Sequence, residues 1–246
     1  MSAAPGPLGR PRIHLRRTDS TNERARELAA QGAPHGTLVT ASEQTAGRGR
    51  QGRRWSAPAG SSLLMSLVLH SPPRLLPLAS ALAVSDVAGP DALIKWPNDV
   101  VVRQGEDDAL GKLAGILVEG RPQGGWAVLG IGLNVAVDLD ELPPELRPGS
   151  REPGARPAAS MGRDASEVEP LLDELLAALH ARLAADEQQI LEDWRARDAL
   201  LGREVSWKEG RGRAEGIDGL GRLVVELPSG GHTALGAGEV HLERLR

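Results

Sequence analysis

Short apolar runs separated by polar, Gly-rich segments occupy the first half of the chain. Four runs rich in Val, Ile and Leu predict buried strands at 37–43, 61–70, 112–120 and 125–135. In ALIKWPNDVVV, residues 92–102, Pro97 has no N–H to donate to a neighbouring strand, so we expect two short strands, one on each side of it. The segment GEDDALG, 105–111, predicts an acidic turn before the third long strand.

Helical periodicity appears in three other segments. They predict helices at 21–30, 75–88 and 168–198. Ser20 or Asp19 is placed to cap the first helix, and the last is strongly amphipathic with an expected break near Asp186.

Three further segments lack helical periodicity. Residues 1–12 are rich in Pro, Gly and Ala, and we expect them to be flexible. Residues 138–162 carry many Pro, Gly, Arg and Glu residues and predict a long flexible loop. After Leu201, short strand-like runs alternate with Gly turns, which predicts a small C-terminal β barrel.

Composition narrows the class of protein. The chain has 246 residues, 40% apolar and 25% charged, which is ordinary for a globular protein. A net charge of −4 argues against a protein that coats nucleic acid. The absence of cysteine excludes disulfides and thiolate chemistry. No apolar run approaches a membrane span and the N-terminus has no signal-type core, so we expect a cytoplasmic protein without a membrane partner.

The segment GRGRQGRRW, 47–55, is the most informative candidate site. Its glycines let the backbone approach an anion, and its arginines can bind phosphate or carboxylate bidentately. It is not a P-loop, because the Gly-Lys-Ser/Thr ending is missing. From these residues alone, an anion site and a solvated basic loop both remain open.

Three weaker candidates follow along the chain. KWPND, 95–99, is either a substrate-orienting corner or an Asx-type turn with a buried Trp. Lys112 heads an apolar strand and points either to solvent or into a pocket, while Gly115 suggests close approach by a ligand or backbone. GIGLN, 130–134, is explained equally well by a bulge.

Five motifs together resemble the biotin–protein ligases. TDSTN (18–22), QTAGRGRQGRRW (44–55), KWPND (95–99), KLAGILVE (112–119) and GIGLNV (130–135) stand in that family's order and approximate spacing. The resemblance covers almost the whole chain. It implies an α+β catalytic domain over 13–199, with a mixed sheet and flanking helices as in class II aminoacyl-tRNA synthetases, and an SH3-like β barrel over 200–246.

The resemblance implies two reactions, formation of biotinyl-5'-AMP from biotin and ATP and then transfer of biotin to a lysine. It places the biotin site at Ser20, Thr21, Asn22, Gln44, Gly47, Arg48, Lys112 and Gly115, with Asn22 more a supporting residue than a direct contact. It places the ATP and adenylate site at Arg48, Gly49, Arg50, Trp55, Lys112 and Asn134. Trp55 would stack on adenine, and Arg53 and Arg54 would lie at the rim of the loop.

Catalysis would fall to Lys112, Asp99 and Arg48. Lys112 would neutralise charge on the α-phosphate and carboxyl oxygens, and Asp99 would receive or orient the acceptor lysine. Magnesium should accompany ATP, and no metal ligand is assigned. Loops 44–55 and 138–162 should be mobile before ligand binds and order over the adenylate.

The implied partner is a biotin carboxyl carrier domain, that of acetyl-CoA carboxylase first. No DNA partner is expected, since there is no room before TDSTN for the helix-turn-helix domain of repressor-type relatives. The chain could be a monomer or a homodimer. The long acidic spacer between KWPND and KLAGIL implies an extended hairpin tip. Rival interpretations are a lipoate–protein ligase, a DNA-binding biotin sensor and an inactive acceptor-binding module.

Overall fold

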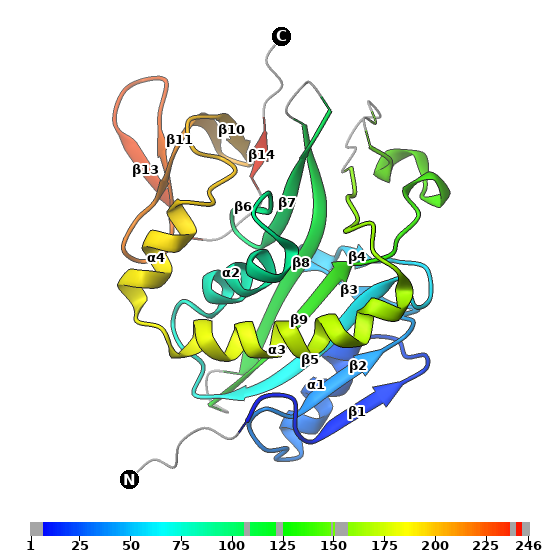
Figure 1. Ribbon diagram of the computed structural model, residues 1–246. Helices are drawn as coiled ribbons and strands as arrows, with labels where there is room; N and C mark the ends of the chain where they lie inside the picture. The colour runs from blue at the N-terminus through cyan, green and yellow to red at the C-terminus, as the bar shows by residue number, and fades with distance from the viewer. Residues whose placement is uncertain are drawn as a thin grey trace.

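A seven-stranded mixed sheet organises the first part of the chain, in the order β1-β2-β5-β9-β8-β7-β6 (Figure 1). The computed structural model describes residues 7–105, 109–121, 125–148, 150, 157–236 and 240–242. The strands are β1 (Arg12–Leu15), β2 (Leu38–Ala41), β5 (Ser62–His70), β6 (Leu93–Lys95), β7 (Asp99–Gln104), β8 (Ala109–Arg121) and β9 (Trp126–Asn134). β1 and β2 pair in parallel and the other neighbours are antiparallel, which confirms the predicted mixed α+β sheet.

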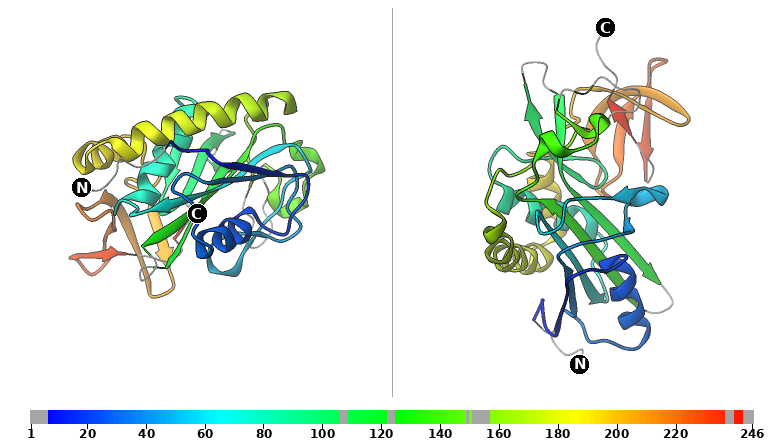
Figure 2. Two further views of the ribbon diagram at one scale, coloured as in Figure 1. Left: turned by 90° about the horizontal axis from the view of Figure 1, so that it is seen from below. Right: turned by 90° about the vertical axis from the view of Figure 1, so that its right-hand side faces the viewer.

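Helices cover both faces of this sheet (Figure 2). They are α1 (Thr21–Ala30), α2 (Leu76–Ala88), α3 (Val168–Ala184) and α4 (Glu187–Arg195). The left view of Figure 2 shows α3 on one side of the sheet and α1 on the other. Because both faces are covered, β5 is buried along its length up to His70, which explains its lack of polar alternation.

The predicted helix at 21–30 is confirmed, but its expected side-chain cap is wrong. Ser20 occupies the N-cap position without a side-chain capping hydrogen bond. Instead the Gln44 side chain accepts a hydrogen bond from the Thr21 N–H at 2.8 Å. The predicted break in the last helix is confirmed, because Asp186 caps α4 by accepting from the Gln189 N–H at 2.9 Å.

Strands β7 and β8 form a longer hairpin than the acidic turn at 105–111 suggested. The pairing continues through Arg103 with Leu110 and Gln104 with Ala109, so residues 109–111 belong to β8 rather than to a turn. That part of the prediction was wrong because ladder hydrogen bonds outweigh the local turn composition. Residues 106–108 of the expected tip lie outside the described residues.

The end of the predicted 138–162 loop is held against the sheet. The N–H of Lys112 donates to the carbonyl of Pro157 at 2.7 Å, and the N–H of Ala159 returns to the carbonyl of Lys112 at 2.8 Å. Earlier in the segment lie two 3-10 turns, η3 (Leu139–Glu141) and η4 (Pro144–Leu146). A wholly irregular loop was therefore the wrong interpretation for these parts, while 149 and 151–156 lie outside the described residues.

At the N-terminus, residues 1–6 of the expected flexible segment 1–12 lie outside the described residues. From Gly9 onward the backbone is hydrogen-bonded, since the Gly9 N–H donates to the Gly36 carbonyl at 2.9 Å.

The C-terminal strands form a second, antiparallel sheet in the order β13-β12-β11-β10-β14. Its strands are β10 (Glu204–Trp207), β11 (Gly210–Ile217), β12 (Leu223–Glu226), β13 (His232–Leu235) and β14 (His241–Leu242). β13 and β14 are its two edges and do not pair in the described ranges, so the predicted barrel is not closed there. Buried Val205 and Leu223 join the main core, and Trp96 Nε1 donates to the Gly221 carbonyl at 3.1 Å.

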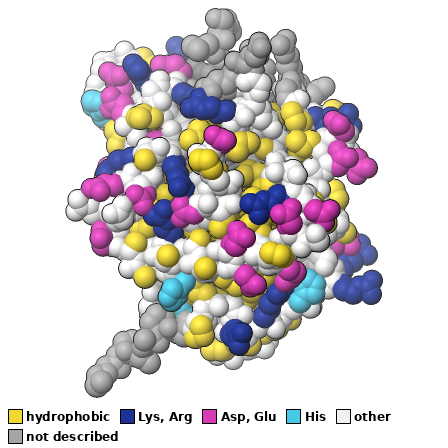
Figure 3. Space-filling model, in the orientation of Figure 1, with side chains coloured by type: hydrophobic (Ala, Val, Ile, Leu, Met, Phe, Trp, Pro, Cys, Tyr) yellow, Lys and Arg dark blue, Asp and Glu magenta, His cyan; other side chains and the backbone are white. Residues whose placement is uncertain are grey.

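Acidic and basic side chains are interspersed on the face that carries α3 (Figure 3). Some of them tie elements together, as Arg182 of α3 pairs with Asp86 of α2 at 2.7 Å. No helix in the described ranges is long and apolar enough to cross a membrane.

Asp198 lies at the junction between the two sheets. The Ile94 N–H donates to the Arg197 carbonyl and the Ala199 N–H donates to the Ile94 carbonyl, at 2.7 and 2.9 Å. The Asp198 carboxylate accepts from the Leu200 N–H at 2.8 Å, while its Oδ2 is buried without a hydrogen-bond partner in the described structure. Burial raises the pKa of Asp198 to about 6, and the N–H groups of Leu200 and Leu201 oppose this rise.

This raised pKa predicts a pH-dependent stability. Between the unfolded pKa near 4 and about 6, the folded state binds more protons, so the free energy of unfolding should fall as pH rises. Asp198→Asn should remove this slope and stabilise the protein by about 3 kcal/mol at pH 8. Urea unfolding of the variant and wild type from pH 4.5 to 8 measures the difference. The exposed Asp91→Asn serves as control, and equal pH slopes in Asp198→Asn and wild type would contradict the assignment.

Candidate active site

A cavity of about 1200 Å³ is lined by residues from the start of α1, the Gly/Arg loop, β7–β9 and the C-terminal sheet. This exceeds the roughly 300–1,000 Å³ of ordinary small-ligand pockets, so two small substrates fit together. All five motifs contribute lining residues. Of the predicted site residues, Ser20, Thr21, Asn22, Gln44, Arg48, Gly49, Arg50, Trp55, Asp99, Lys112, Gly115 and Asn134 line it, as do Arg53 and Arg54.

Gly47 is the predicted residue that does not line the cavity. It pairs with Trp55 where β3 (Gly47–Arg48) meets β4 (Arg54–Trp55). A Cβ there would lie 2.4 Å from the Trp55 carbonyl oxygen and 2.9 Å from Gln44 Nε2. Gly47 therefore permits close packing of the loop on itself, which is a structural role.

The start of α1 forms one end of the cavity. Gln44 Oε1 accepts from both the N–H and the hydroxyl of Thr21, at 2.8 and 3.1 Å. The Ser66 hydroxyl of β5 lies 2.9 Å from the Thr21 hydroxyl. Thr21 and Gln44 thus hold each other in place. Ser66, which contacts Thr21, was not among the predicted site residues.

Besides Asp99 Oδ1, which forms an ion pair with Lys112, two buried polar atoms of residues lining the cavity have no hydrogen-bond partner in the described structure, Ser20 Oγ and Trp55 Nε1. A buried hydroxyl or indole N–H without a partner costs free energy. Since Ser20 does not cap α1, its hydroxyl is left for a polar group entering the cavity. This is the donor-and-acceptor chemistry that an apolar ligand with a polar head requires.

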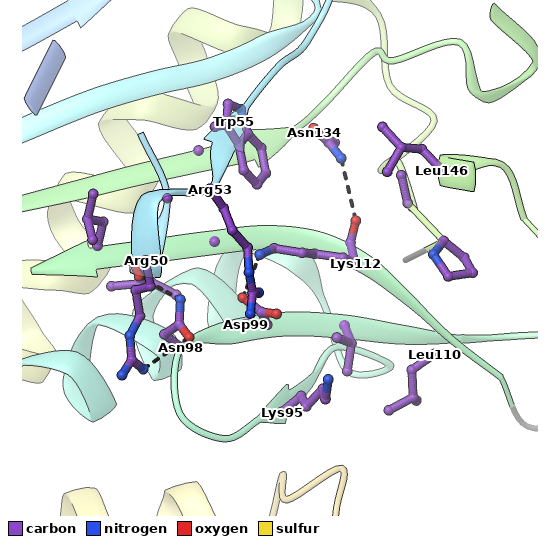
Figure 4. Close-up of a pocket in the computed structure, with 18 of the residues that line it drawn as sticks. Arg50, Arg53, Trp55, Lys95, Asn98, Asp99, Leu110, Lys112, Asn134 and Leu146 are labelled. Atoms are coloured by element: carbon purple, nitrogen blue, oxygen red, sulfur yellow. Dashed lines mark hydrogen bonds and ion pairs between the residues drawn. The ribbon is translucent and has the colours of Figure 1, made fainter. Parts of the chain in front are cut away.

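Lys112 and Asp99 meet in the middle of the cavity. Lys112 Nζ lies 2.6 Å from Asp99 Oδ1, with the two side chains 31% and 20% exposed. Figure 4 shows Lys112 extending from β8 toward Asp99 on β7, with Arg53 pointing at the same place from the loop. Lys112 therefore points into the cavity, which settles the alternative that it faces solvent at the strand end.

The Trp55 ring packs on the backbone of two glycines, Gly115 of β8 and Gly132 of β9. A Cβ on Gly115 would lie 3.1 Å from its ring and one on Gly132 would lie 2.6 Å away. Lys112 Nζ sits 5.6 Å from the ring centroid, within the range of a cation–π contact. The indole thus covers the strand surface at Gly115, the position at which the resemblance places biotin.

The WPND corner supports the loop. Asn98 donates to the Ile116 carbonyl at 2.9 Å and accepts from Arg50 Nη1 at 3.3 Å. Burial lowers the pKa of the Arg50 guanidinium, and the Asp99 carboxylate counteracts this. Arg50 therefore brings a partly desolvated positive charge into the cavity, where it interacts strongly with an anion.

Asn134 holds the wall of the cavity together. Its Nδ2 donates to the Ala159 carbonyl at 2.9 Å and lies 3.5 Å from the Lys112 carbonyl (Figure 4). Ser62 donates to its Oδ1 at 3.3 Å. These contacts tie β9, β5 and the end of the 138–162 segment to the strand that carries Lys112.

Arg48, a predicted anion ligand, is held by two carboxylates. Its Nη1 lies 2.5 Å from Glu23 Oε2 and its Nη2 lies 3.1 Å from Glu119 Oε1. Sequence analysis missed Glu119, although the alternation of a strand places it on the same side of β8 as Gly115 and Leu117. That alternation was the available signal.

Residues in and next to the C-terminal sheet also line the cavity, and no local sequence pattern predicted this contact between the two parts of the chain. These residues are Gly202, Arg203, Glu204, Arg213, His241 and Leu242. Asp99 and Glu204 are the carboxylates that line the cavity. No group of three or more His, Asp or Glu side chains placed to hold a metal occurs in the described ranges.

The fold and cavity together are those of an enzyme that holds two small substrates, one of them anionic, beside a lysine. Comparisons with known families agree with this class. The Biotin/lipoate A/B protein ligase family matches residues 14–136, and the biotin protein ligase C-terminal domain matches residues 200–242. The chain belongs to the biotin protein ligase family.

Individual relatives cover most of the chain. A biotin–[acetyl-CoA-carboxylase] ligase of Paracoccus denitrificans is 39% identical over 242 residues, covering 88% of this chain and 94% of the relative. The ligase of the same name from Mycobacterium tuberculosis is 35% identical over 91% of this chain and 85% of its own length. The solved biotin protein ligase of Aquifex aeolicus in complex with biotin and ATP has a TM-score of 0.71 and 27% identity, covering 96% of this chain and 100% of that one.

Proposed function

We propose that this protein is an ATP-dependent biotin–protein ligase. The observation that carries the proposal is the single cavity in which Ser20, the arginine loop and the Lys112–Asp99 pair lie together. An apolar wall with a polar end suits biotin, and a cationic loop suits ATP. The family membership supports the same activity.

In the first half-reaction, a biotin carboxylate oxygen attacks the α-phosphorus of ATP, and pyrophosphate leaves. Both substrates are anions, so cations must offset their repulsion. We assign that role to Lys112, Arg48 and Arg50, which line the cavity. Ser20, with its unpartnered hydroxyl, would bind the polar head of biotin, positioned by the Thr21–Gln44 pair.

In the second half-reaction, the acceptor lysine amine attacks the acyl carbon of biotinyl-5'-AMP, and AMP leaves. Asp99 would receive the acceptor ammonium before it loses its proton. Lys112 Nζ lies 2.6 Å from this carboxylate. The acceptor ammonium could therefore replace Lys112 as the partner of Asp99, which would leave Lys112 to interact with the substrate. Lys112 can then stabilise the oxygen charge that develops on the shared phosphate and acyl centre.

Trp55 covers Gly115 in this structure, so biotin can lie on Gly115 only when the indole moves. The displaced ring, with its unpaired Nε1, then offers a flat apolar face for adenine. Magnesium would neutralise the phosphates of bound ATP, and we assign it no protein ligand.

The acceptor would be a biotin carboxyl carrier domain, that of acetyl-CoA carboxylase first, as the names of the two relatives suggest. The reaction is expected in the cytoplasm, and a monomer and a homodimer remain alternatives. The C-terminal sheet, proposed as an SH3-like module, would close the end of the cavity through Arg203 and Arg213.

Biotin transfer to a purified carrier domain, with ATP and magnesium, tests the proposal. We expect ATP-dependent incorporation into the carrier domain and none into a carrier whose target lysine is replaced by arginine. Lipoate with a lipoyl domain is the parallel assay for the rival ligase. Transfer of lipoate without transfer of biotin would overturn the proposal.

A further inference from the structure

The two carboxylate oxygens of Glu119 contact residues of two different motifs. Oε2 accepts from Asn22 Nδ2 of the TDSTN motif at 2.9 Å. Oε1 lies 3.1 Å from Arg48 Nη2 of the Gly/Arg loop. The Glu119 side chain is 22% exposed, so these contacts are less screened than those of a surface pair.

At the first contact, the surroundings allow Asn22 only one orientation. Ser66 donates to Asn22 Oδ1 at 2.6 Å, which leaves Nδ2 to find an acceptor. Asn22 is 4% exposed, and a Cβ on Gly130 would lie 1.9 Å from its Oδ1. Glu119 supplies that acceptor and thereby fixes Asn22, which lines the cavity next to Thr21.

At the second contact, the guanidinium of Arg48 is held between Glu119 and Glu23. A guanidinium has five N–H donors in a fixed plane, and two acceptors leave several of them for a ligand. Holding the cation in advance lowers the entropy cost of ordering a Gly-rich loop when substrate binds. The contact therefore fixes the orientation of the Arg48 side chain and leaves N–H donors available for a ligand.

We propose that Glu119 is a positioning residue for adenylate formation and retention. It couples the loop cation Arg48 to the biotin-side residue Asn22, so that each is in place before the anionic substrates arrive. This inference rests on the proposed ligase function, since the role of Arg48 toward anions comes from it.

A double-mutant cycle tests the coupling. Glu119→Gln keeps an oxygen for Asn22 but turns an NH₂ group toward Arg48. We expect it to raise the KM for biotin and the rate of adenylate loss without acceptor by about 3- to 10-fold, the size of one charge-assisted contact. In an Arg48→Ala background the same change should have less than about a 2-fold effect, since its partner is gone.

Two matched glutamate variants separate positioning from general charge loss. Glu23→Gln removes a partner of Arg48 and should have a smaller effect that also disappears in the Arg48→Ala background. Glu43→Gln removes an exposed pair with Arg17, and since neither residue lines the cavity, this variant should behave as wild type. Additive effects of Glu119→Gln and Arg48→Ala, or a Glu119→Gln variant equal to Glu43→Gln, would overturn the proposal.

Limited trypsin digestion gives a readout that does not need ligase activity. Released from Glu119, the arginine-rich loop should be cut several-fold faster in Glu119→Gln than in wild type at equal urea stability. If Glu119→Gln folds poorly, Glu119→Asp, too short to reach both partners, should show the same faster cleavage. Faster cleavage in a protein that transfers no biotin would overturn the ligase function and leave the restraint by Glu119 standing, whereas unchanged cleavage would refute the restraint.

Discussion

Replacing Lys112 by alanine should lower the rate of biotin transfer to a carrier domain by about 100- to 1,000-fold, as for loss of one preorganised charge at a reacting centre. Lys112 Nζ lies 2.6 Å from Asp99 and 5.6 Å from the Trp55 ring centroid, inside the cavity. Removing it leaves the Asp99 carboxylate without this cation and the developing phosphate and acyl charges less neutralised. Both half-reactions should slow, because they share the same phosphate and acyl centre.

The measurement is single-turnover formation of biotinyl-5'-AMP, followed by transfer to the carrier domain. Lys208→Ala is the matched control, because Lys208 is exposed in the turn between β10 and β11 and does not line the cavity. Urea unfolding of each variant separates lost chemistry from lost folding. Transfer by Lys112→Ala at the wild-type rate would show that the assigned mechanism is wrong.

Gly130→Ala should weaken biotin binding by about 10- to 100-fold, which corresponds to the roughly 1–3 kcal/mol that overpacking costs in a filled interior. The new methyl group would lie 1.9 Å from Asn22 Oδ1 and 2.7 Å from its Cγ. Asn22 cannot step aside easily, since Ser66 and Glu119 hold both ends of its amide. The clash therefore moves Asn22, which lines the cavity at the proposed biotin site.

Calorimetric titration with biotin measures this loss, and Gly219→Ala is the control because nothing lies within 4 Å of its would-be Cβ. In an Asn22→Ala background, Gly130→Ala should cost much less, since the atoms that the methyl group meets are absent. Gly130 lies in regular pairing with Ser66 and Leu117 and is not a bulge residue, so wild-type affinity in Gly130→Ala would mean that the clash with Asn22 does not affect biotin binding.

Local patterns were sufficient to predict most of the elements. The helix predicted at 21–30 is α1 as observed, and the run at 61–70 is the buried strand β5. Both succeeded because periodicity reports which side chains are buried, and burial depends on a short stretch of chain. The prediction failed at 109–111, where pairing with β7 extends a strand through residues of turn-like composition.

Capping at α1 shows a different limit. Ser20 precedes the helix in the place of a side-chain cap, yet the Thr21 N–H is satisfied by Gln44, a residue of another motif. The interaction spans 23 positions in the sequence. The residues around Ser20 contain no information about Gln44, so the local capping rule predicted the wrong partner for the Thr21 N–H. As a result of the actual contact, the Ser20 hydroxyl does not cap the helix and is available to a ligand in the cavity.

The sequence by itself determined the family, the strands and helices that carry its motifs, and the kinds of chemistry that Lys112, Asp99 and the arginine loop can perform. The tertiary structure alone decided which side chains meet. Glu119 reaches Asn22 across 97 positions, Trp55 lies on Gly115 and Gly132, and the C-terminal sheet lines the cavity. The physical reason is that residue type and periodicity act between near neighbours, whereas these contacts depend on strand order, register and the packing of two sheets on one core.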